Sequence, residues 1–263
     1  MLNLLISIGL ALAAFGLGAL SGKWTYGLAP ALFVFPVAFF LLARRTSKQV
    51  EAILGAAMAA LQQRKIDEAK QLLESARPLA RWQFLVNEQL NAQLGAIEYL
   101  QRNTSAARPL LEGSWSRNWQ AMGMLAVILH REGNTAEGLA KLAKAEYFAS
   151  KEPLYWGLRA WLHLEIGQRD QALAVTVEGL GGTDGSEALK QLRGAIANDK
   201  LKGMRWDQVF GQAWFSFFPD MVPQAANQQV KPQPIFPKDV PSAMRRGGMT
   251  WPCLLYTSDA ADE

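Results

Sequence analysis

Two stretches of this 263-residue chain share a pattern at a spacing of 34 residues: GNTAEGLAKLAKAEYFA at 133–149 and GQRDQALAVTVEGLGG at 167–182. Each begins with a glycine and polar residues and continues as a run rich in alanine and leucine. An apolar stretch precedes each of them, at 122–132 and at 155–166. Apolar side chains recur at three- and four-residue spacing, which is typical of amphipathic helices. The pattern predicts two consecutive helix–turn–helix units.

Related segments occur earlier in the chain. KIDEAKQLLESARP at 65–78 and TSAARPLLEGS at 104–114 repeat the second-helix pattern, whereas no alternation of β-branched residues indicates a sheet. Because one helix pair cannot bury its apolar face alone, several must stack. We therefore expect an all-α domain at 46–218, with about four helix pairs and a terminal pair at 187–198 and 206–218. The predicted polar turns lie at 63–65, 102–104, 131–134 and 167–170.

This pattern resembles the tetratricopeptide repeat, a helix–turn–helix unit, over residues 50–186. Trp156 matches the start of the family's W-x2-L-G pattern, and Leu94 with Gly95 matches its later pair in an earlier repeat. The small, apolar and small positions of the second helix fall on Ala69, Leu73 and Ala76; Ala107, Leu111 and Ser114; Gly138, Leu142 and Ala145; and Ala172, Thr176 and Gly179. The family's tyrosine position departs from the pattern, with Ala60, Glu98, Leu129 and His163.

The resemblance implies an α-solenoid whose concave groove, lined by the first helix of each pair, binds a protein or peptide partner. Projecting the period onto this chain places these candidates in the groove: Gln89, Tyr99, Gln120, Met124, Val127, His130, Arg131, Trp161 and Glu165. Trp161 and Arg131 are of the types that most often dominate binding energy, although Trp161 is equally compatible with simple packing. The aromatic residues of 206–218 are expected to seal the last repeat's core, with partner binding as the alternative.

The first 45 residues predict a transmembrane helical hairpin. Leu2–Ser21 and Tyr26–Ala43 are uncharged and close to the length that crosses a bilayer. Basic residues follow the second span, so the positive-inside rule places the downstream domain in the cytoplasm. We expect an integral protein of the bacterial inner membrane; a signal peptide cleaved near Ser21 is the alternative. The predicted interface residues are Lys23, Trp24, Tyr26, Arg44, Arg45 and Lys48.

Composition excludes several kinds of site. A net charge of +4 does not indicate a nucleic-acid binder, and one cysteine with two histidines excludes a disulfide framework and disfavours a metal centre. The glycine-rich stretch at 179–185 lacks the Lys-Ser/Thr of a phosphate-binding loop, and no catalytic set stands out. We therefore expect a protein that is not an enzyme and that binds no cofactor or metal; its partners are a protein or peptide and the lipid bilayer.

The C-terminal part is expected to lie outside the fold. Residues 219–252 are rich in proline, glutamine and alanine and predict a disordered tail, and 253–263 (CLLYTSDAADE) resembles a translated sequencing adapter. The leading hypothesis is a membrane-anchored scaffold that mediates protein–protein interaction. Two alternatives stay open: a HemY-like membrane protein associated with haem synthesis, which shares the order of two membrane helices and a repeat domain, and the anchor of a larger enzyme truncated after residue 252.

Overall fold

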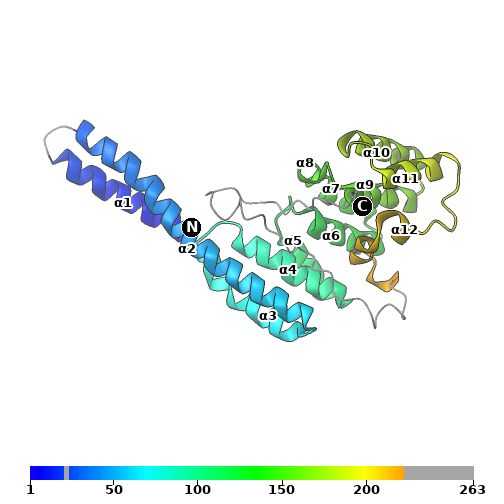
Figure 1. Ribbon diagram of the computed structural model, residues 1–263, viewed down its shortest axis with the longest axis horizontal. Helices are drawn as coiled ribbons and strands as arrows, with labels where there is room; N and C mark the ends of the chain where they lie inside the picture. Colours follow the sequence, from blue (N-terminus) through cyan, green and yellow to red (C-terminus); the bar gives the residue numbers. More distant parts are fainter. Residues whose placement is uncertain (21–23, 222–263) are drawn as a thin grey trace, which may run out of the picture. The chain divides into compact units, whose positions relative to one another are not determined.

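The computed structural model describes residues 1–20 and 24–221, and this part of the chain is helical without a strand (Figure 1). The all-α prediction is therefore confirmed. Lys23, the tail from residue 222 and the stretch 253–263 lie outside the described residues. The α-helices are α1 Leu2–Ala19, α2 Thr25–Gln62, α3 Ile66–Ser75, α4 Val86–Leu100, α5 Thr104–Glu112, α6 Trp119–Arg131, α7 Thr135–Ala143, α8 Glu146–Ala149, α9 Pro153–Glu165, α10 Arg169–Gly182, α11 Glu187–Ala197 and α12 Trp206–Phe210. The 3₁₀ helices are η1 Arg77–Arg81, η2 Gln212–Ser216 and η3 Pro219–Met221. The described residues divide into two compact units, 1–90 and 91–221.

The four predicted turns, and a fifth turn after α11 that was not predicted, share one geometry. After α2, α4, α6, α9 and α11, one residue adopts a positive φ, between 56° and 86°. The next residue's N–H then donates to the carbonyl five positions back, at 2.8–2.9 Å. This arrangement is a Schellman motif, which satisfies the carbonyls that a helix end leaves open. The positive-φ residues are Arg64, Arg102, Gly133, Gly167 and Asp199.

The second helix of each pair has the predicted register. Every small and apolar position named for α3, α5, α7 and α10 is buried. Two of the glycines also allow close approach to the preceding helix. A Cβ on Gly138 would lie 2.9 Å from the Ala126 carbonyl oxygen of α6, and one on Gly179 would lie 2.5 Å from the Trp156 ring of α9. Small residues at these positions are thus required by packing.

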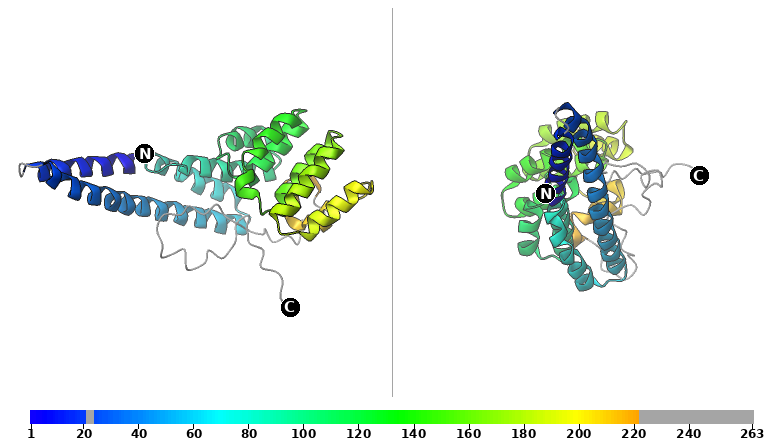
Figure 2. Two further views of the ribbon diagram at one scale, coloured as in Figure 1. Left: turned by 90° about the horizontal axis from the view of Figure 1, so that it is seen from above. Right: turned by 90° about the vertical axis from the view of Figure 1, so that its left-hand side faces the viewer.

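In the N-terminal unit, α1 lies beside the first part of α2, and α3 packs against the rest of α2 (Figures 1 and 2). The two apolar helices approach closely at glycines: a Cβ on Gly18 would lie 2.5 Å from the Cα of Gly27. The predicted domain boundary at 45/46 falls inside α2, which is continuous from Thr25 to Gln62. One helix therefore serves both as the second apolar helix and as the first helix of the first pair, because nothing in its sequence after Pro36 breaks it.

In the second unit, α6 and α9 contribute the largest part of a core that also includes α7, α10, α11 and three aromatic residues near its C-terminal end, Trp214, Phe217 and Phe218. The prediction of one helix at 206–218 is wrong. The chain breaks at Gly211, whose φ is 73°, and separates α12 from η2. Glycine adopts this left-handed conformation without steric cost. The break redirects the following aromatic side chains onto α6 and α9.

Candidate functional site

The predicted groove residues lie on α4, α6 and α9, but only some of them are accessible. Tyr99, Met124, Val127 and Trp161 are buried, which corrects their assignment to an open groove. They belong to the core because they face the same interior as the other apolar residues of their helices. Gln120 and His130 are half-buried, and Arg131 and Glu165 are exposed. Gln89 belongs to the N-terminal unit.

Residues later in the same chain contact two of the buried members, Trp161 and Tyr99. We call Trp206–Met221 the C-terminal segment. The Trp161 ring contacts Trp214 and Phe218 of this segment, with ring centroids 6.5 and 4.6 Å apart. Phe217 packs against Trp119, at 5.9 Å between centroids. Part of the face of α6 and α9 that the repeat pattern assigns to a partner is therefore occupied by residues of the same chain.

Aromatic rings of this segment pack directly against two glycines. A Cβ on Gly123 of α6 would lie 2.6 Å from the Phe217 ring, and one on Gly157 of α9 would lie 2.3 Å from the Phe210 ring. The two glycines are 34 residues apart, the same spacing as that of the two related stretches in the sequence. That spacing, together with the aromatic residues at 206–218, was a signal in the sequence that the groove assignment did not use.

Polar contacts anchor the end of the segment. The Tyr99 hydroxyl donates a hydrogen bond of 2.6 Å to the Phe217 carbonyl oxygen. Burial raises the pKa of Tyr99 above its usual value, so this hydroxyl keeps its proton and acts as a donor. Arg102 and Arg131 each lie within 3.1 Å of the Asp220 carboxylate, and Arg102 also donates to the Pro219 carbonyl oxygen at 3.3 Å.

Next to this anchor is a small open cavity of about 320 Å³. Its lining is mixed in polarity and contains both arginines as well as Asp220. Both guanidinium groups pair with the Asp220 carboxylate, so the arginines bind a carboxylate of the same chain here. The remaining lining residues are Tyr99, Thr104, Ile128, Glu132 and Pro219.

The two histidines of this unit each hydrogen-bond a side chain five residues further along the chain. His130 Nδ1 hydrogen-bonds the Thr135 hydroxyl at 2.9 Å and His163 Nδ1 hydrogen-bonds Gln168 at 2.8 Å, so each histidine bridges a helix turn. Within residues 1–20 and 24–221, no three His, Cys, Asp or Glu side chains lie close enough together to hold a metal ion. Burial raises the pKa of Glu152, before α9, to about 7.

The predicted membrane-interface residues lie at the two ends of the apolar hairpin. Trp24 and Tyr26 are exposed at its turn, and Arg44, Arg45 and Lys48 are exposed further along α2. Lys23 lies outside the described residues. Helix α1 and the first part of α2 are long and apolar enough to cross a membrane, and few of their side chains are buried inside the protein. No protein-family model, curated protein or solved structure matches this chain.

Proposed function

We propose that this protein is a membrane-anchored scaffold of the tetratricopeptide type that binds another protein on the cytoplasmic side of the membrane. The observation that supports the proposal is that one chain contains both an apolar helix pair suited to a membrane and a series of helix–turn–helix pairs. An apolar helix pair with its side chains largely exposed is joined, through the continuous helix α2, to helix pairs that close with the same turn.

The exposed apolar side chains favour a bilayer. Leu12, Leu17, Leu32 and Phe33 are each at least 65% exposed, and such a surface is costly in water. Arg44, Arg45 and Lys48 follow the second apolar stretch directly, and the loop at its other end contains only Lys23. This asymmetry favours a cytoplasmic position for the remaining chain.

The C-terminal segment is held by groups on α4, α6 and α9 and in the turn after α4, and these contacts support the proposal that the same helices can bind a peptide. Glycines admit aromatic rings, Tyr99 donates to a backbone carbonyl, and a pair of arginines binds a carboxylate. We then expect the partner to contact groove residues of α6 and α9 that remain accessible. Gln120, half-buried on α6, and Glu165, exposed on α9, are two predicted groove residues that do not pair with Asp220.

A photo-crosslinking amino acid placed in the full chain tests both parts of this proposal in cells. We expect Gln120 and Glu165 positions to give one shared adduct that stays in the membrane fraction after alkaline carbonate extraction. Val177, which is 51% exposed on α10, is the matched control and should not give that adduct. Release of the chain by carbonate would contradict the anchor; equal adducts at all three positions, or none, would contradict the partner surface.

A further inference from the structure

The start of α1 and the end of the apolar part of α2 lie side by side, and a buried polar contact joins them. Asn3 near the start of α1 donates from Nδ2 to the Thr46 hydroxyl of α2, at 3.1 Å. Both side chains are buried, and the Ser7 hydroxyl donates to the Asn3 carbonyl oxygen at 2.7 Å. Near this contact α2 changes from apolar to charged, beginning with Arg44 and Arg45. If the hairpin spans a bilayer, the level of this contact is its boundary with the headgroups.

A loop from elsewhere in the N-terminal unit is tied to this level. We call Ala76–Leu85 the interfacial loop; it includes η1 and connects α3 with α4. The α-amino group of Met1 donates to the Arg81 carbonyl oxygen at 2.7 Å, and the Asn3 backbone N–H donates to the Trp82 carbonyl oxygen at 3.3 Å. Because α1 has no side-chain cap, these carbonyls satisfy donors that its first turn leaves open.

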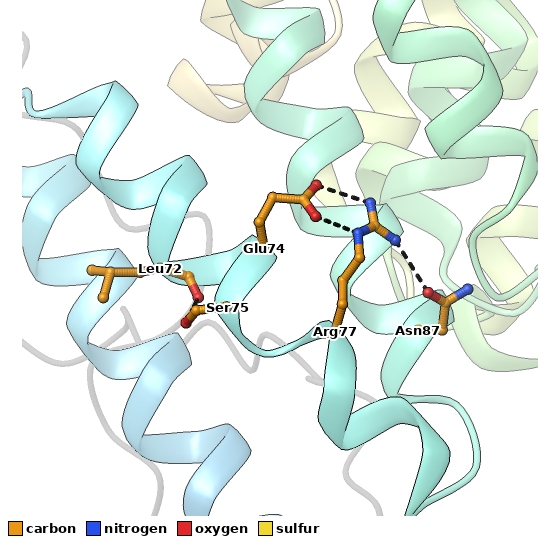
Figure 3. Close-up of polar contacts among 5 residues, drawn as sticks. All are labelled: Leu72, Glu74, Ser75, Arg77 and Asn87. Carbon is orange, nitrogen blue, oxygen red and sulfur yellow. Dashed lines mark hydrogen bonds and ion pairs between the residues drawn. The ribbon is translucent and has the colours of Figure 1, made fainter.

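Two further contacts hold the loop in place. The Gln83 side chain hydrogen-bonds the Ser47 hydroxyl of α2 at 3.3 Å. Figure 3 shows Arg77 at the start of the loop, paired through two nitrogens with Glu74 of α3 and donating to Asn87 of α4 at 3.2 Å. The loop is thus fastened both to the hairpin and across its own two ends.

The side chains that remain exposed on the loop suit a lipid headgroup region. Trp82 is 39% exposed and Phe84 is 44% exposed, and Arg81 is exposed beside them. The loop contains no acidic residue. Aromatic and basic side chains together are typical of the membrane–water interface, and basic side chains near it attract anionic lipids. At the opposite end of the hairpin, exposed Trp24 and Tyr26 have the same character.

We infer that the interfacial loop is a third membrane contact of this protein, in which Trp82 and Phe84 insert among the headgroups while Arg81, with Arg44, Arg45 and Lys48 of α2, binds anionic lipid. In the described residues no acidic side chain pairs with these four basic residues, so their charges are available to lipid phosphates. The inference rests on the membrane anchor of the proposed function. Its consequence is that the start of α4 is fixed against the bilayer surface rather than attached through α2 alone.

Depth-dependent quenching in the full chain tests the inference. Cys253 is replaced by serine, and a single cysteine carrying an environment-sensitive fluorophore is placed at Trp82 or at Phe84. Leu12, 65% exposed on α1, is the reference for the bilayer interior. Gln63 is the reference for water, since it lies roughly 25 Å along the α2 axis from Thr46. The protein is reconstituted in phosphatidylcholine bilayers with and without phosphatidylglycerol, with nitroxide placed in the headgroup or in the acyl chain.

We expect headgroup nitroxide to remove most of the emission at positions 82 and 84, and more completely when phosphatidylglycerol is present. Acyl-chain nitroxide should quench position 12, and neither probe should quench position 63. In the chain labelled at 84, Trp82→Ser together with Arg81→Ser should restore much of the emission. If 82 and 84 behave like 63 while 12 is quenched, the loop faces water or a protein partner and the inference is wrong, although the anchor stands. If 12 is not quenched, the proposed anchor itself fails.

Discussion

Phe217 lies against Gly123 so closely that a Cβ on the glycine would be 2.6 Å from the phenylalanine ring. This contact joins the C-terminal segment to the middle of α6 and leaves no room for a side chain. The same glycine faces Leu158 of α9, where an added Cβ would meet a methyl group at 2.9 Å. Gly123 is therefore the point at which α6, α9 and the C-terminal segment meet.

Gly123→Ala should destabilise the C-terminal unit. The added methyl group must displace the Phe217 ring or α9, and overpacking of this kind costs about 1–3 kcal/mol. Urea unfolding in detergent, followed by tryptophan fluorescence, measures the change. Gly194→Ala is the control, because a Cβ at this α11 position meets nothing within 4 Å and alanine favours a helix. Unfolding of both variants at the same urea concentration would contradict tight packing at Gly123.

Tyr99→Phe should loosen the C-terminal segment without emptying the space around the ring. The substitution removes only the hydroxyl that donates to the Phe217 carbonyl oxygen and leaves a buried acceptor unpaired. We expect a loss of about 1–2 kcal/mol of unfolding free energy and faster proteolysis near Phe217. Tyr147→Phe is the matched control, since Tyr147 is 83% exposed. Equal cleavage rates in both variants would show that the hydrogen bond does not hold the segment.

Glu152 should make stability depend on pH. Its pKa in the folded protein is about 7, raised by burial from its ordinary value of 4.5. Folding therefore takes up a proton between these two values, so the full stability is present below pH 4.5 and is lost as pH rises through 7.

Glu152→Gln should remove this dependence and raise the unfolding free energy at pH 8 by ~1–3 kcal/mol. The exposed Glu165→Gln serves as control and should leave the profile of the unsubstituted protein unchanged. The measurement is the unfolding free energy of each protein at a series of pH values. A Glu152→Gln profile as steep as that of the original protein would contradict the assignment.

Arg64→Gly should stabilise the turn between α2 and α3. Arg64 has a φ of 61°, a conformation that costs side-chain-bearing residues about 1–2 kcal/mol. Glycine removes this cost but loses more entropy on folding, so we expect a net gain of about 0.5–1 kcal/mol. Gln62→Gly, in the last turn of α2, should change stability in the opposite direction. The midpoint of thermal unfolding in detergent is measured for both variants. Equal changes of this midpoint in the two variants would exclude turn strain at Arg64 as the cause.

The local features of this protein were predictable from its sequence. The polar turns lie where expected, and the buried positions of α3, α5, α7 and α10 follow the predicted register, from Ala69 to Gly179. Both features depend on neighbouring residues: a helix ends where polar residues satisfy its last carbonyls, and a helix buries the face on which its apolar and small residues recur.

Only the tertiary structure decided which residues of α6 and α9 are covered by other parts of the chain and which remain accessible. Trp161 satisfies the period of a groove residue, yet it is buried because Trp214 and Phe218 return to it after the chain breaks at Gly211. The contact of Tyr99 with Phe217 joins residues 118 positions apart. Periodicity describes which side of a helix turns inward, whereas the identity of the group that covers that side depends on how distant rings and glycines fit together in space.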